Sequence, residues 1–287
     1  HHLTMEMLPL AVQAAMAAIE KICPEAKNLL LIPQRDTRNT FYLSNLQRLI
    51  QIFHQAGLNV RVGTLDADIA EPTEVPLPDG STLTLEPLQR SKWRVGLKDF
   101  DPCTILLNDD LSAGVPAALA NLHEQYLLPP LHAGWNVRRK SNHFRAYEEV
   151  AKKFAKLLGM DAWLINPMYA RCGEVDLAAP AGRDALMSHA EALLGKIRRK
   201  YKEYGIQEKP FVIVKAESGA SPLSLKTVRD VKDLADLTSC ALKQSSSGET
   251  RAELILQEGV PTYERVNDAV AEPVVTMIDR YVVGGYY

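Results

Sequence analysis

The stretch Lys209-Pro210-Phe211-Val212-Ile213-Val214-Lys215-Ala216-Glu217-Ser218-Gly219 decides how the second half of this chain folds. Four consecutive apolar residues, three of them β-branched, predict a strand that is buried on both faces. Because open α/β sheets bind ligands at strand ends, we expect the Lys215 ammonium to enter a crevice there. Backbone N–H groups of the following Glu-Ser-Gly-Ala turn would face an anion such as phosphate. The plainer interpretation is a solvated charge at a strand end.

Two later segments extend this pattern. Residues 253–260 (ELILQEGV) predict a second strand, and residues 272–286 predict a hairpin that turns at Asp279-Arg280. A strand ending in lysine, a second ending in Gln-Glu-x-Val and a third entered after an acidic residue together resemble the ATP-grasp ligases. The resemblance implies two lobes that close on a nucleotide, with Lys215 on its phosphates. It also implies an ATP site that includes the phosphate turn and the adenine edge, at Gly219, Gln257, Glu258 and Val260.

The composition bounds the class of protein. A length of 287 residues allows two domains, and 46% hydrophobic with 24% charged residues is typical of a globular protein. A formal charge of -2 gives no overall attraction to nucleic acid or to a membrane surface. No stretch approaches the roughly 18 apolar residues that span a bilayer. The four cysteines are far apart in sequence, which predicts reduced thiols in the cytoplasm: Cys23, Cys103, Cys172 and Cys240.

The first part of the chain predicts a β-α-β unit. Residues 28–33 read as a buried strand, Tyr42 to Ala56 has the apolar period of an amphipathic helix that Gly57 ends, and residues 58–63 give the next strand. Such a unit implies two parallel strands with a right-handed crossover. An alanine-rich helix precedes it, and residues 104–110 predict a further strand that ends in polar groups.

The loop inside this unit has two interpretations. It carries Arg35 and Arg38, with Asn39 and Thr40 beside a helix N-terminus. Guanidinium groups pair bidentately with carboxylates and the helix end adds positive potential, so the loop would be a good carboxylate receptor. Alternatively, Asp36, Thr37 or Asn39 caps the helix and both arginines are solvated.

Residues 129–144 (PPLHAGWNVRRKSNHF) form the densest polar stretch of the chain. Proline, glycine and tryptophan predict a shaped loop that links two lobes, followed by a helix from Tyr147 to Leu158. Its basic residues are interleaved with Trp135, Asn136 and His143, which suits anion recognition. In a ligase of the kind that the resemblance implies, Lys140 is the candidate for binding phosphates, and Arg138 and Arg139 are candidates for substrate carboxylates. Nucleic-acid binding requires a broader basic surface than this composition supplies.

Several stretches together resemble the proteobacterial type of glutamate–cysteine ligase. The most specific are Arg-Asp-Thr-Arg-Asn-Thr at residues 35–40 and Leu-His-Ala-Gly-Trp-x-Val-Arg-Arg-Lys-Ser at residues 131–141, and the likeness runs through nearly the whole chain. The resemblance implies an enzyme that joins glutamate to cysteine with ATP and Mg2+, the first step of glutathione synthesis. In that reaction ATP converts the γ-carboxylate of glutamate to an acyl phosphate, and the cysteine amine displaces the phosphate.

Two departures from the family pattern leave an alternative open. The turn after Lys215 carries one glycine and a proline, Pro222, where the family is glycine-rich, and the chain ends at Tyr287, before the arginine and magnesium ligands expected from the family. The alternative is a catalytically degenerate nucleotide or amino-acid binding protein of the same fold. Catalytic residues, metal ligands and homo-oligomer formation stay open.

The predicted fold is therefore α/β and two-lobed. It consists of an N-terminal α/β substrate-side domain at residues 1–131 and an ATP-grasp-like nucleotide-binding domain at residues 132–287, with its second lobe incomplete. The predicted partners are the small molecules glutamate, cysteine and ATP, with no nucleic acid and no membrane.

Overall fold

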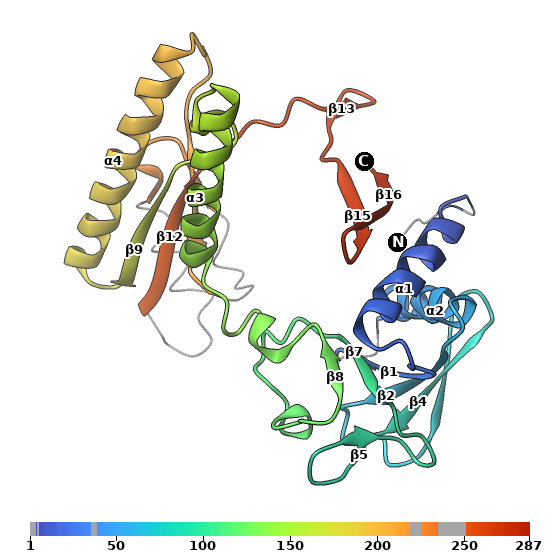
Figure 1. Ribbon diagram of the computed structural model, residues 1–287. Coiled ribbons are helices and arrows are strands. Elements are labelled where there is room, and N and C mark those ends of the chain that lie inside the picture. The colour runs from blue at the N-terminus through green and yellow to red at the C-terminus, as the bar shows by residue number, and fades with distance from the viewer. Residues whose placement is uncertain (1–3, 5, 36–38, 219–225, 235–250) are drawn as a thin grey trace. The chain divides into compact units, whose positions relative to one another are not determined.

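The structure is a computed structural model that describes residues 4, 6–35, 39–218, 226–234 and 251–287. The chain forms two compact units: unit 1 comprises residues 1–134 and 262–287, and unit 2 comprises residues 135–261 (Figure 1). This division differs from the predicted domains at the C-terminal end, because Val283 is buried in the same core as the first two helices. The predicted α/β class is confirmed in both units. In the part of the chain that is described, no helix is long and apolar enough to cross a membrane.

Unit 1 is built on a six-stranded sheet in the order β3-β4-β2-β1-β7-β8. The predicted β-α-β unit is confirmed, because β1 and β2 pair in parallel with Leu29 opposite Val60 and flank helix α2. Strand β7 pairs in parallel with the other edge of β1. These elements are α1 (Leu8–Ile22), β1 (Asn28–Pro33), α2 (Thr40–Gln55), β2 (Asn59–Thr64), β3 (Thr73–Pro76), β4 (Thr82–Pro87), β7 (Thr104–Asn108) and β8 (Tyr126–Leu128).

Alternate residues of β1 face two different cores. Leu29 and Leu31 pack with α1 and α2, whereas Leu30 and Ile32 pack with the opposite core that contains Phe100. A strand covered on both faces must be apolar at every position, which is why residues 29–32 read as a continuous hydrophobic run.

The remaining elements of unit 1 are short. The predicted hairpin at Asp279-Arg280 is confirmed: β15 (Val274–Ile278) and β16 (Tyr281–Tyr286) pair antiparallel. After β7, residues 117–119 form a short 3-10 turn, and Pro116 lies at its start. The other elements are β5 (Gln89–Arg90), β6 (Val95–Gly96), η1 (Ala117–Leu119), η2 (Leu131–Ala133), β13 (Arg265–Val266) and β14 (Ala269–Val270).

Unit 2 has a four-stranded antiparallel sheet in the order β11-β10-β12-β9. The expectation that β10 is covered on both faces was wrong. Val212 and Val214 are fully buried against α4, while Ile213 and Lys215 on the other face are half-buried. An antiparallel strand next to one helix layer needs only alternate apolar positions. The strands are β9 (Tyr169–Asp176), β10 (Val212–Ala216), β11 (Lys226–Val228) and β12 (Arg251–Glu258).

Two long helices complete unit 2, with η3 (Ala162–Leu164) between α3 and β9. Helix α4 (Pro180–Glu203) fills the main core of the unit with residues such as Leu194 and Ile197. Helix α3 (Lys140–Leu158) begins seven residues earlier than the sequence predicted, so the basic segment ends on a helix N-terminus instead of lying wholly in a loop. The helix begins early because Lys140 and Ser141 at its start hydrogen-bond to Glu217, which follows β10 and is distant in sequence.

Candidate functional site

Lys215, the predicted lysine, lies near the end of β10, beside the last residues of strand β12. Lys215 Nζ donates a hydrogen bond of 2.6 Å to Gln257 Oε1. Ile213 pairs with Gln257 in the antiparallel register, so Ile213, Lys215 and Gln257 share one face of the sheet. Val212 and Val214 point to the opposite face, into the α4 core. The polar groups therefore gather on the sheet face that α4 does not cover.

Lys140 brings a second amine to the same strand end. It is the first residue of α3, and its Nζ donates to the carbonyl of Ala216 at 2.8 Å. Burial lowers the pKa of Lys140, and the neighbouring Lys215 charge lowers it further. Burial also lowers the pKa of Lys215. Two partly desolvated cations that repel one another are stabilised by a bound anion, so the pair suits a polyphosphate.

A buried carboxylate fixes the position of Lys140. Glu217 is 1% exposed, and its Oε1 accepts from Ser141 N at 3.0 Å and from Ser141 Oγ at 2.5 Å. The Lys140 N–H donates to the Glu217 carbonyl at 3.0 Å. Arg139 at the N-cap makes no side-chain capping bond, so Glu217 supplies the negative charge that a helix N-terminus favours.

The sequence did not predict this role for Glu217. Its backbone N–H was expected to face an anion, but it donates to the carbonyl of Glu253 at 2.8 Å, so this group is already used by the fold. Among the described residues, Glu217 Oε2 is buried without a hydrogen-bond partner. Helix α3 begins at Lys140 after Arg139, which makes no side-chain capping bond, so nothing local in the sequence pointed to Glu217.

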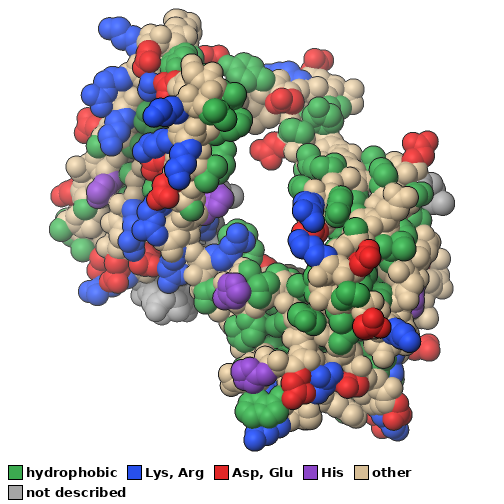
Figure 2. Space-filling model, viewed as in Figure 1, with side chains coloured by type: hydrophobic (Ala, Val, Ile, Leu, Met, Phe, Trp, Pro, Cys, Tyr) green, Lys and Arg blue, Asp and Glu red, His purple; other side chains and the backbone are tan. Residues whose placement is uncertain are grey.

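The two arginines before α3 lie close to other charged and aromatic groups. Arg138 stacks over the ring of Trp135, with 5.0 Å between its guanidinium carbon and the ring centroid. Arg139 forms an ion pair with Glu253, 3.6 Å between Nε and Oε2. Figure 2 shows many Lys and Arg side chains over the helices of unit 2. Arg138 is exposed, whereas Arg139 is half-buried and already pairs with Glu253, so Arg138 is the more available of the two for a ligand.

The segment predicted to hold an adenine edge is anchored by its own contacts. The Glu258 carboxylate is 3% exposed and accepts from Trp163 Nε1 and from the Met168 backbone N–H. Burial raises the pKa of Glu258. The backbone N–H groups of Glu258 and Gly259 donate to Met168 O and Phe211 O, so these two groups are already used by the fold.

In unit 1, the predicted arginine loop is only partly described. Asn39 caps α2: its Oδ1 accepts from Phe41 N at 3.1 Å and from Tyr42 N at 3.2 Å, as the helix-cap interpretation predicted. Arg35 is exposed, and Arg38 lies outside the described residues. The Tyr42 hydroxyl donates to Asn108 O at 2.8 Å, which holds this loop beside the end of β7.

The structure therefore brings Lys140, Lys215 and Gln257 together in unit 2, whereas Arg35 and Asn39 belong to unit 1. Gly219, the remaining predicted phosphate ligand, lies outside the described residues. Within the described ranges, no group of three or more His, Cys, Asp or Glu side chains could hold a metal ion.

The full chain matches the GshA family, glutamate-cysteine ligase, over residues 1–287. It is 49% identical to a provisionally named gamma-glutamylcysteine synthetase from Methylobacillus flagellatus KT, with a TM-score of 0.89 over 99% of this chain and 67% of that one. D-alanyl-alanine synthetase A from Vibrio cholerae is 11% identical with a TM-score of 0.41, over 88% of this chain and 68% of that one, a similarity too low to carry an argument. No match was found among curated proteins.

Proposed function

This chain belongs to the glutamate–cysteine ligase family, and we propose that it is an ATP-dependent ligase that joins the γ-carboxylate of glutamate to the amine of cysteine. The observation that carries the proposal is the family match along the whole chain. The paired lysines at the end of β10 support it, because a ligase of this kind must neutralise a polyphosphate.

We propose that Lys140 and Lys215 bind the ATP phosphates, with Gln257 orienting Lys215. Gly219, which lies outside the described residues, is a further proposed phosphate ligand. The backbone around Glu258 and Val260 is the proposed adenine contact, and Val260 is 66% exposed. When bound, ATP activates the glutamate carboxylate as an acyl phosphate. The role of the protein is then mainly to hold charges and reactants in position.

The residues present fit ATP better than they fit a metal ion. Two amines with lowered pKa values supply cationic donors for phosphate oxygens. Magnesium prefers oxygen ligands, often one or two carboxylates with substrate phosphates. The described residues offer no cluster of three or more such side chains. We therefore propose that the reaction uses Mg2+, as the family resemblance implies, and assign no protein ligands to the ion.

For the substrate carboxylates we propose Arg35, Arg38, Arg138 and Arg139. The side-chain oxygen of Asn39 already serves α2, so its contribution would come through the position of the loop. We also propose a cytoplasmic location, because the reaction requires cysteine in its reduced form and the cytoplasm keeps thiols reduced.

The decisive experiment measures phosphate release with ATP, glutamate and cysteine together and with each amino acid omitted. Release that requires both amino acids is expected. ATP binding without such release would reject the ligase and favour the degenerate binding protein.

The lysine assignment has its own test. Lys215→Ala should weaken ATP binding at least about tenfold, because a hydrogen bond to a charged group contributes roughly 1.5–3 kcal/mol. Lys202→Ala, an exposed lysine on α4, is the matched control and should bind ATP as the parent chain does. Equal affinities of the two variants would remove Lys215 from the site.

A further inference from the structure

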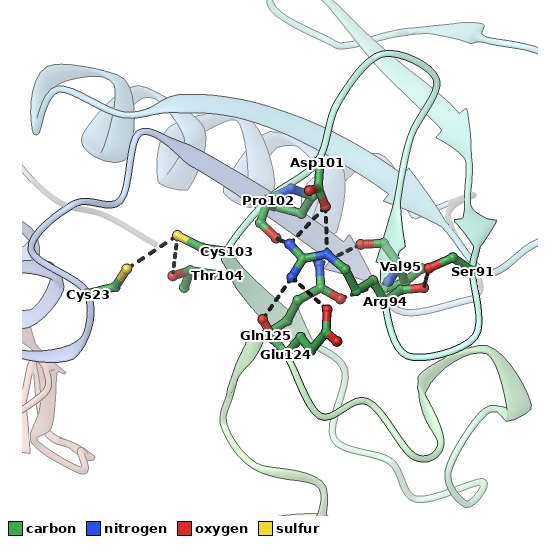
Figure 3. Close-up of polar contacts among 10 residues, drawn as sticks. All are labelled: Cys23, Ser91, Arg94, Val95, Asp101, Pro102, Cys103, Thr104, Glu124 and Gln125. Carbon is green, nitrogen blue, oxygen red and sulfur yellow. Dashed lines mark hydrogen bonds and ion pairs between the residues drawn. The ribbon is translucent and has the colours of Figure 1, made fainter.

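Two cysteines that are 80 positions apart in sequence meet in unit 1. The Sγ atoms of Cys23 and Cys103 lie 3.3 Å apart, with the Cys103 thiol also 3.6 Å from Thr104 Oγ1 (Figure 3). Cys23 is the C-cap of α1, and Cys103 directly precedes β7. Neither residue is among the proposed ATP or substrate ligands.

The local structure holds both thiols in place. The Cys23 backbone N–H donates to Ile19 O at 2.8 Å, which ties this residue to the last turn of α1. The Cys103 carbonyl accepts from Tyr126 N at 2.9 Å, next to the pairing of β7 with β8. Both side chains are half-buried, so they are neither sealed in the core nor free to swing in solvent.

We propose that Cys23 and Cys103 form a reversible disulfide. A disulfide has an S–S distance of about 2.05 Å, so the two sulfurs need to approach by little more than 1 Å, which side-chain rotation can supply. The third described cysteine, Cys172, lies in unit 2 and has a pKa raised to about 11 by burial, which makes it a poor reactant. A structural zinc site would need further ligands, and the described residues offer no cluster of three.

The oxidant is a low-molecular-weight disulfide of the glutathione class. One protein thiolate attacks this disulfide, forms a mixed disulfide and releases one small thiol. The second protein thiol then loses its proton and attacks the protein sulfur of the mixed disulfide, which expels the second small thiol. Two protein thiols are thereby oxidised by two electrons, one small disulfide is reduced to two thiols, and excess small thiol reverses the exchange.

The pKa of the Cys23 thiol is raised, chiefly by its hydrogen bond with Cys103 and then by burial. Since the thiolate is the attacking species, attack by Cys23 is faster in mildly alkaline solution than at neutral pH. The disulfide would join the end of α1 to the start of β7, and so restrict the helix that packs against the C-terminal hairpin.

The test uses the full reduced chain, incubated with glutathione disulfide and then alkylated. Mass spectrometry of the intact protein should show loss of two of the four alkylatable thiols, and peptide mapping should recover a Cys23–Cys103 cross-link. Cys172→Ser is the matched control and should still form the cross-link. Cys23→Ser and Cys103→Ser should each lose it.

The parent chain alone can refute the proposal, independently of how the serine variants fold. Four alkylatable thiols after excess oxidant, a stable mixed disulfide at one cysteine, or a cross-link through a different cysteine would each overturn it. Because this readout does not involve ligation, its failure would leave the proposed function untouched. Excess glutathione should restore all four thiols, and irreversible oxidation would also contradict the proposal.

Discussion

Removal of the Glu217 carboxylate should destabilise unit 2 by about 2 kcal/mol. In Glu217→Ala, the Ser141 N–H and hydroxyl both lose a buried anionic acceptor. A hydrogen bond to a charged group contributes roughly 1.5–3 kcal/mol, and loss of a helix cap costs about 0.5–2 kcal/mol. The two figures describe the same contacts and do not add. The carboxylate also has an oxygen without a partner among the described residues, so removing its burial cost keeps the net loss near the middle of these ranges.

The assay must report on unit 2 alone, because a chain with two units need not unfold in one transition. Trp135 and Trp163 belong to unit 2 and Trp93 to unit 1, so fluorescence in a Trp93→Phe background follows unit 2. With a urea m-value of about 2 kcal/mol/M, a loss of about 2 kcal/mol lowers the midpoint by roughly 1 M.

Glu149→Ala is the matched control, because Glu149 is an exposed carboxylate on the same helix. The free energy of unfolding of this variant should stay within about 0.5 kcal/mol of the parent value, as expected for an exposed surface site. If Glu217→Ala is no more destabilised than Glu149→Ala, the carboxylate does not hold the start of α3 and the reasoning fails.

Three further outcomes are expected. Asn39→Ala should lower the stability of unit 1 by about 1 kcal/mol in urea unfolding, because α2 loses its cap; an unchanged midpoint would contradict that role. The pKa of Asp161 is lowered from 3.8 to about 2, first by Lys200, so this carboxylate stabilises the fold above about pH 4 and the contribution is lost as the pH falls toward 2. Asp161→Asn should therefore lose less stability than the parent between pH 5 and 2. If the free energies of unfolding of the two proteins fall equally over this range, the ion pair of Asp161 with Lys200 does not stabilise the fold. Gly259→Ala should destabilise unit 2, because a Cβ there would lie 1.9 Å from the Phe211 ring; a midpoint equal to that of the parent would show that the ring moves freely.

The sequence by itself determined the β-α-β unit of the first half. Residues 29–32 are apolar at every position because both faces of β1 are covered, and the 3.6-residue period of α2 follows from its single buried face. The cap at Asn39 was also among the local predictions, since its contacts reach only two and three residues along the chain.

The sequence also identified Lys215 from its place at a strand end and Lys140 from a basic polar segment, whereas Gln257 came from family resemblance. Only the tertiary structure showed that Lys215 contacts Gln257, 42 residues away, on a sheet that is antiparallel. Strand direction depends on which segments pair, and a short apolar run carries no information about its partner.

Tertiary structure alone also decided where α3 begins and which thiols meet. Glu217 lies 76 residues from Ser141, and Cys23 lies 80 residues from Cys103. Local propensity reports on neighbours within a few residues, so a cap or a thiol pair that comes from a distant strand leaves no periodic signal. These contacts exist because the sheets bring distant strand ends together, and they are fixed only when the whole unit folds.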